Sequence, residues 1–128
     1  LTKQFHYNDI QSLKTQINRF KNNIACVILE PSSTECPKIN KEDSACCNLS
    51  KCNRNFKKEN HFLKQVELVC KKNNIVFILD EMITGFRWHL KGAQNFYGVK
   101  PDLSTFGKAM ANGFSVSAVC GKKKIMEL

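Results

Sequence analysis

The sequence predicts an α/β domain with a mainly parallel sheet and crossover helices, and two observations carry this prediction. First, continuous apolar runs at 24–29 and 75–79 are typical of strands that are covered on both faces, as in a parallel sheet. Second, residues 61–72, which lie between these runs, repeat their apolar side chains with a helical period. A strand, a helix and a second strand in this order form a right-handed βαβ unit. The chain of 128 residues is long enough for one hydrophobic core.

The first thirty residues contain a candidate edge strand, a helix and a buried strand. Residues 1–7 alternate in part between polar and apolar side chains, which favours an edge strand. Asp9 is a suitable helix N-cap, and apolar residues then recur every three or four positions, so 9–20 is predicted to be an amphipathic helix. The polar stretch 21–23 ends this helix, and the strand at 24–29 follows.

The segment 32–60 is polar and charged and has no clear period, which indicates a loop or an insertion. It contains four of the seven cysteines: Cys36, Cys46, Cys47 and Cys52. Four thiolates would suffice for a structural zinc ion, but two of them are adjacent and no C-x-x-C pair is present. Unpaired thiols are therefore favoured over a metal site. The odd total of cysteines also argues against a disulfide framework.

The second half of the chain continues the alternation of strands and helices. Its predicted elements are, in order, a crossover helix at 61–72, a strand at 75–79, a turn at 82–87, a loop at 88–99, a strand at 103–106, a glycine-bearing turn at 111–113 and a last strand at 114–120.

Two of these predicted strands end next to side chains that could take part in catalysis. Asp80 and Glu81 follow the strand at 75–79, and Lys108 follows the strand at 103–106 after one glycine. Ligands of open α/β sheets bind at the carboxyl ends of the strands. Pyridoxal phosphate chemistry needs such a pair, because an amine forms the Schiff base and a carboxylate keeps the pyridine nitrogen protonated. The simpler alternatives are an Asp that caps the next turn and a lysine on the surface.

Three segments resemble the class III aminotransferases that bind pyridoxal phosphate: DEMITGFR, GAQNFYGVKPDLSTFGKAMANG and GKKKIMEL. Within that class they most resemble the glutamate-1-semialdehyde 2,1-aminomutase branch. The resemblance is strong over 75–128, weaker over 1–31 and absent from 32–60. It implies the large domain of a fold type I pyridoxal-phosphate-dependent transferase, which acts as a homodimer in the cytoplasm.

The resemblance also assigns roles to five residues. It implies that Lys108 binds the cofactor as a Schiff base and moves a proton during the reaction, and that Asp80 pairs with the pyridine nitrogen. Ile83 stands where many class III transaminases have a glutamine that faces the ring hydroxyl, so it is expected to contact the cofactor. An apolar residue there resembles the aminomutase branch. Glu81 and Glu30 are expected to support the site without touching the cofactor.

The resemblance leads to one expected function and one alternative. Residues 1–128 are expected to form part of the cofactor-binding large domain, without the N-terminal segment that cups the cofactor phosphate and without the C-terminal small domain. The expected function is an aminotransferase or aminomutase for a small amino acid or amino aldehyde. The run at 111–113 replaces a triple-glycine-like run common in the branch, so the substrate stays open. The alternative is a truncated or degenerate relative that acts as a binding module.

The net charge of +9 comes from 20 Lys and Arg residues against 11 Asp and Glu residues. These basic residues are spread along the chain, and the only triple run is at 122–124, so a solvated lysine-rich surface is favoured over a nucleic-acid site. No stretch approaches the roughly 20 apolar residues of a membrane span, so no membrane partner is expected. The three histidines have no metal-binding spacing, and no metal site is assigned to them.

Overall fold

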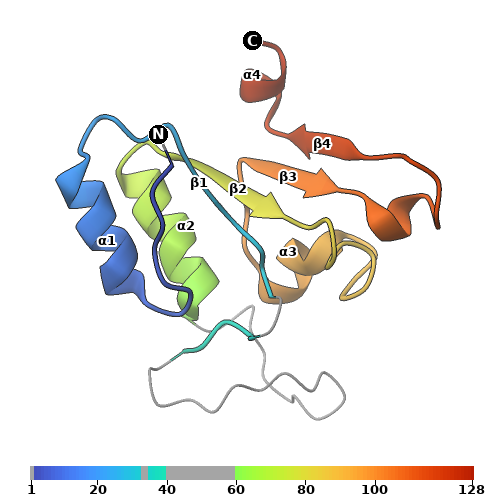
Figure 1. Ribbon diagram of the computed structural model, residues 1–128, viewed down its shortest axis with the longest axis horizontal. Coiled ribbons are helices and arrows are strands. Elements are labelled where there is room, and N and C mark those ends of the chain that lie inside the picture. Colours follow the sequence, from blue (N-terminus) through green and yellow to red (C-terminus); the bar gives the residue numbers. More distant parts are fainter. Residues whose placement is uncertain (1, 33–34, 40–59) are drawn as a thin grey trace.

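The computed structural model describes residues 2–32, 35–39 and 60–128. Its centre is a four-stranded sheet in the order β1-β2-β3-β4, in which the first three strands are parallel and the fourth is antiparallel (Figure 1). The helices α1 and α2 lie side by side next to β1 and β2 (Figure 1). The predicted α/β architecture with a mainly parallel sheet is confirmed.

Helix α1 spans Ile10–Arg19 and begins after Asp9, as predicted. The Asp9 carboxylate accepts hydrogen bonds from two amides of the first turn, which otherwise have no partner within the helix. Leu13 and Ile17, one helical turn apart, are buried in the core. The apolar face of α1 therefore decides how the helix packs.

Helix α2 spans Phe62–Lys72, within the range predicted for the crossover helix. Its apolar side is buried, and two lysines in its last turn complement the helix dipole. His61 caps the first turn through Nδ1, and its Nε2 lies 2.9 Å from the carbonyl oxygen of Tyr97. The cap thus also ties α2 to a segment far along the chain.

The strands β1 (Cys26–Leu29) and β2 (Val76–Asp80) pair in parallel register, as the βαβ prediction requires. Their burial alternates along the chain, however, instead of being complete on both faces. Phe77 is almost fully buried, whereas 54% of the Ile28 surface is exposed. The prediction that these strands are covered on both faces is wrong for the described part of the chain. The helices α1, α2 and α3 pack into one core with one side of the sheet, and the side chains on its other side are more exposed.

The predicted edge strand at 1–7 is also wrong for residues 2–7, which form no strand. The partial alternation in this segment serves side-chain packing instead. Phe5 and Tyr7 pack against the core, and the Tyr7 hydroxyl donates a hydrogen bond to the carbonyl of Pro31 at 2.6 Å. The ring of Tyr7 also meets that of Phe62 edge to face, with centroids 4.9 Å apart.

The predicted loop at 88–99 contains a short helix, α3, which spans Gly92–Tyr97. Gly92 and Gly98 favour a loop in the sequence, but they form the two ends of this helix, and both have positive φ angles. The helix also depends on the buried carboxylate of Glu81, which holds its first turn. A local pattern cannot reveal such a distant cap.

The strand β3 spans Leu103–Phe106, as predicted, and runs into a 3₁₀ turn at Lys108–Met110. A last strand is predicted at 114–120, but the observed strand, β4, is shorter and begins later, at Ala118–Gly121. Residues 114–117 precede it and line a cavity instead. A short helix, α4, follows at Lys123–Met126.

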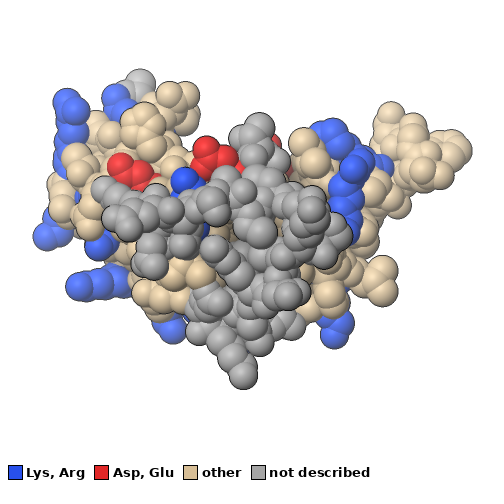
Figure 2. Space-filling view, turned by 90° about the horizontal axis from the view of Figure 1, so that it is seen from below, with Lys and Arg blue, Asp and Glu red and all other residues tan. Residues whose placement is uncertain are grey.

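The hypotheses about Cys46, Cys47 and Cys52 lie outside the described residues. Cys36 is described and is buried. In the described ranges, no group of three or more His, Cys, Asp or Glu side chains could hold a metal ion. None of the helices described is long and apolar enough to cross a bilayer. In Figure 2 the visible Lys and Arg side chains of the described residues lie mainly toward the two sides of the view.

Candidate active site

The carboxyl ends of the parallel strands bring four polar side chains to one edge of the sheet. The register pairs Asp80 of β2 with Thr105 of β3. The register of β1 and β2 pairs Leu29 with Leu79, so Glu30, the next residue, is level with Asp80. Lys108 follows β3 after one residue, Gly107. This is the edge at which open α/β sheets bind their ligands.

Asp80 is held through one of its two carboxylate oxygens. Oδ1 accepts a hydrogen bond from the Met82 amide at 3.0 Å and another from the Thr105 hydroxyl at 2.9 Å. Oδ2 makes no hydrogen bond to the described residues. Since side chains alternate along a strand, Asp80 lies on the sheet face opposite to the buried Phe77 and Leu79. One oxygen is thus fixed and the other stays available to a ligand.

Lys108 is exposed and begins the 3₁₀ turn after β3. Its φ angle of 43° lies in the left-handed region, which is costly for a residue with a side chain and persists only where the surroundings enforce it. The side chain of Met82 packs against Gly107, where an added Cβ would collide with it. The turn that carries Lys108 is therefore pressed against the turn that follows Asp80.

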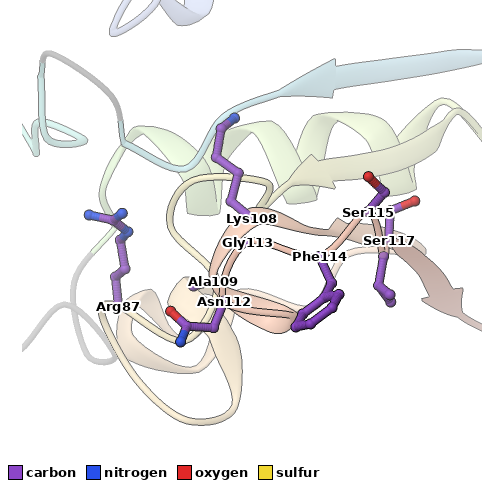
Figure 3. Close-up of a pocket in the computed structure, with 9 residues that line it drawn as sticks. Arg87, Lys108, Ala109, Asn112, Gly113, Phe114, Ser115 and Ser117 are labelled. Carbon is purple, nitrogen blue, oxygen red and sulfur yellow. The ribbon is translucent and has the colours of Figure 1, made fainter.

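A cavity of about 740 Å³ opens beside this turn. It is lined by Arg87, Lys108, Ala109, Asn112, Gly113, Phe114, Ser115, Val116 and Ser117. In Figure 3 the side chains of Arg87 and Lys108 extend toward the same side. Two cations and no acidic side chain line the cavity among the described residues, so it favours an anionic or electron-rich ligand. Asp80, Ile83 and Glu30 do not line it.

Glu81 faces away from Asp80 and is completely buried. Its carboxylate accepts hydrogen bonds from the amides of Ala93 at 2.5 Å and Gln94 at 3.0 Å, at the start of α3. Burial raises the pKa of Glu81, and the hydrogen bonds from Gln94 and Ala93 oppose this rise only in part. Glu81 thus anchors the turn that leads from β2 to α3.

The other two candidate residues are Ile83 and Glu30. Ile83 is 42% exposed and lies in the turn that follows β2. The Glu30 side chain has one oxygen, Oε2, that is buried and makes no hydrogen bond among the described residues. Thr105 is not among the residues that the sequence singles out, because only the register between β2 and β3 shows that it meets Asp80.

Comparison with known proteins gives a consistent result. The family model "Aminotransferase class-III" matches residues 54–128. Glutamate-1-semialdehyde 2,1-aminomutase from Francisella philomiragia is 39% identical over 121 residues, which are 94% of this chain and 24% of that protein. The enzyme of the same name from Chlorobium phaeobacteroides is 40% identical over the same shares. The chain thus spans 24% of the length of these curated relatives.

Solved structures show the same likeness. The FumI protein from Sphingopyxis, in its PLP internal aldimine form, matches with a TM-score of 0.73 and 27% identity, over 98% of this chain and 27% of that one. An ornithine aminotransferase from Plasmodium yoelii matches with a TM-score of 0.70 and 28% identity, over 94% of this chain and 28% of that one. The segment around Asp80 and Lys108 lies inside the range of the family match, and the chain belongs to the class-III aminotransferase family.

Proposed function

We propose that this chain forms part of a pyridoxal-5'-phosphate-dependent aminotransferase or aminomutase in which Lys108 binds the cofactor covalently. One observation carries this proposal. The Asp80 carboxylate and the Lys108 amine stand at the carboxyl ends of two neighbouring parallel strands, in a chain of the class-III family. These are the two groups that such a cofactor requires from the protein.

The residues present fit the cofactor in their chemistry. The Lys108 amine is exposed on the wall of a cavity, where it can meet an aldehyde carbon. Asp80 has one oxygen fixed by two donors and a second oxygen free to accept from a protonated ring nitrogen. When bound, the cofactor withdraws electrons from the carbon that bears the substrate amino group.

Lys108 has a second task in this proposal. With the cofactor bound, the Lys108 amine would act first as a general base and then as a general acid, because it would accept a proton from the substrate α-carbon and donate that proton to C4′ of the cofactor. Its place on the cavity wall leaves the amine free for this movement. Asp80 acts at the other end of the ring, where its negative charge favours a protonated nitrogen.

We infer that the substrate is a small amino acid or amino aldehyde, and that the reaction resembles that of glutamate-1-semialdehyde 2,1-aminomutase. The identity of 39–40% to enzymes of that name supports this choice. The apolar Ile83 in the turn after β2 supports it as well. The relatives do not favour the alternative of a binding module without catalysis.

We further propose that residues 1–128 are part of the large domain of a subunit that works as a homodimer in the cytoplasm. The resemblance to the family supports this assembly, and light scattering on the intact protein would test it. Glu30 and Glu81 would support the site from the ends of β1 and β2, Glu30 beside Asp80 and Glu81 through α3.

The covalent link is tested by borohydride reduction of the protein expressed from its complete gene. Reduction should fix the cofactor on the peptide that contains Lys108, as read by mass spectrometry, and Lys108→Ala should abolish this product. Lys72→Ala, which removes an exposed lysine from the end of α2, is the matched control and should leave it intact. A Lys108→Ala variant that still yields covalently reduced cofactor would contradict the assignment.

The role of Asp80 is tested separately. Asp80→Ala should lower the turnover rate by about two orders of magnitude, because an uncompensated ring nitrogen loses its proton. Cofactor occupancy, measured by absorbance, should fall much less, since the covalent bond to Lys108 remains. Equal losses of occupancy and rate would show that Asp80 only helps to bind the cofactor.

A further inference from the structure

We propose that Thr105 is a positioning residue that orients the Asp80 carboxylate toward the cofactor ring. The inference rests on the proposed function, because it gives Thr105 a task only where Asp80 pairs with the ring nitrogen. Its basis is the hydrogen bond of 2.9 Å from the Thr105 hydroxyl to Oδ1 of Asp80.

The direction of this hydrogen bond is settled by chemistry. An ionised carboxylate can only accept hydrogen bonds, so the Thr105 hydroxyl must donate its single hydrogen to Asp80. The Met82 amide donates to the same oxygen at 3.0 Å. With two donors on Oδ1, the oxygen left for a protonated ring nitrogen is Oδ2.

The two donors differ in what they fix. Met82 lies two residues after Asp80, so its amide forms a local turn that moves together with Asp80. Thr105 belongs to the neighbouring strand, directly opposite Asp80 in the register. The hydroxyl therefore fixes the carboxylate relative to β3, the strand that leads into Lys108.

Thr105 is itself held in place. Its β-branched side chain has few rotamers, and its carbonyl accepts a hydrogen bond from the Glu81 amide at 3.0 Å. On its other side it pairs with Val119 of β4. A hydroxyl on this rigid support is a good reference point for a carboxylate. Without it, only the Met82 amide would hold Oδ1, and the carboxylate would turn more easily about its last bond and exchange its two oxygens.

The test uses the intact protein loaded with cofactor that carries ¹⁵N at the ring nitrogen. Thr105→Val removes the hydroxyl with almost no change in shape, and Thr105→Ser keeps a hydroxyl. Ser104→Ala is the matched control, since it removes a hydroxyl from the same strand at a position that pairs with Leu79 on the other face.

The expected result is a change in the two variants that lose the hydroxyl, Thr105→Val and Thr105→Ala, and no change in Ser104→Ala. In Thr105→Val the ring-nitrogen resonance should move toward that of the unprotonated ring, and the turnover rate should fall about tenfold, as for loss of one hydrogen bond to a charged group. The substrate KM and the product of borohydride reduction at Lys108 should stay close to wild type. Thr105→Ser should restore both signals, and Thr105→Ala should behave like the valine variant.

Two outcomes would overturn the inference in different ways. If the wild type carries reducible cofactor on Lys108 but Thr105→Val and Thr105→Ala keep the wild-type nitrogen resonance, Thr105 has no positioning role and the proposed function stands. If the wild type carries no reducible cofactor on Lys108, the proposed function fails, and the role of Thr105 fails with it.

Discussion

Glu81 and Gly92 form a buried contact on which the start of α3 depends. Both oxygens of Glu81 accept amide hydrogens, and an added Cβ at Gly92 would lie 2.6 Å from one of these oxygens. The φ angle of +78° at Gly92 is also one that side chains rarely adopt. Gly113 shares a positive φ, +108°, but an added Cβ there would meet nothing within 4 Å.

The two glycines therefore make a matched pair. We expect Gly92→Ala to lower the free energy of unfolding by about 3 kcal/mol, since it adds backbone strain and disturbs the hydrogen bonds of a buried carboxylate. Gly113→Ala should cost about 1 kcal/mol from strain alone. Urea denaturation of the 128-residue chain measures both. Equal losses would show that Glu81 does not constrain position 92.

Cysteine reactivity should also differ from residue to residue. Burial, followed by the charges of Asp102 and Cys26, raises the pKa of the Cys70 thiol to about 12. Since the thiolate is the reactive form, Cys70 should resist alkylation at pH 8. The thiols of Cys26 and Cys120 are exposed and should react. Iodoacetamide labelling with peptide mass spectrometry checks this, and rapid labelling of Cys70 in the folded chain would contradict it.

Asp102 connects three elements at the opposite edge of the sheet. Its carboxylate accepts a hydrogen bond from the Phe77 amide of β2 at 2.8 Å. It also forms an ion pair with Lys122, which lies next to β4, at 2.5 Å. Its own backbone bonds to the same two residues. Burial by itself would raise the pKa of Asp102, but the contacts with Lys122 and Phe77 lower it below its ordinary value of 3.8.

A lowered pKa means that the folded state favours the charged form. The stabilisation by Asp102 is therefore complete well above pH 3.8 and is lost as the pH falls through the lower pKa of the folded state. Asp102→Asn should lower the free energy of unfolding by about 1–3 kcal/mol at pH 7. The difference in the free energy of unfolding between this variant and the wild type should become smaller as the pH falls below 3.8. Urea denaturation at several pH values measures it.

Two lysine variants serve as controls for this prediction. Lys122→Met should cost less than Asp102→Asn, because the Lys122 side chain is 62% exposed and exposed ion pairs contribute little. Lys123→Met removes a lysine whose ion pair within the described residues is with the exposed Glu127, and this variant should have almost no effect on the free energy of unfolding. A pH-independent loss in Asp102→Asn would show that its charge is not what stabilises the sheet.

In the described part of the chain, one face of the sheet is buried and the other is partly exposed to solvent. This asymmetry leads to a prediction about stability. Val27 and Ile28 are neighbours in β1, yet 6% of Val27 is exposed against 54% of Ile28. In the 128-residue chain, Val27→Ala should cost about 2 kcal/mol, and Ile28→Ala should cost well under 1 kcal/mol. Thermal unfolding of the two variants compares them directly. Similar losses would mean that both faces are covered in solution.

Much of the architecture could be predicted because its signals are local. Asp9 caps α1 through amides two and three residues away, and the apolar period of 61–72 identifies α2 without any partner. The apolar run at 75–79 likewise identifies β2. In each case the residues that favour the element are the residues within it or next to it.

The sequence alone was enough to place a carboxylate, Asp80, and an amine, Lys108, at the ends of two strands. Only the tertiary structure decided that Glu81 caps α3, that the two faces of β1 differ and that Thr105 meets Asp80. The physical reason is that these three features depend on pairing between strands or on contacts between distant turns. Neither local propensity nor hydrophobic period carries information about such register and contact.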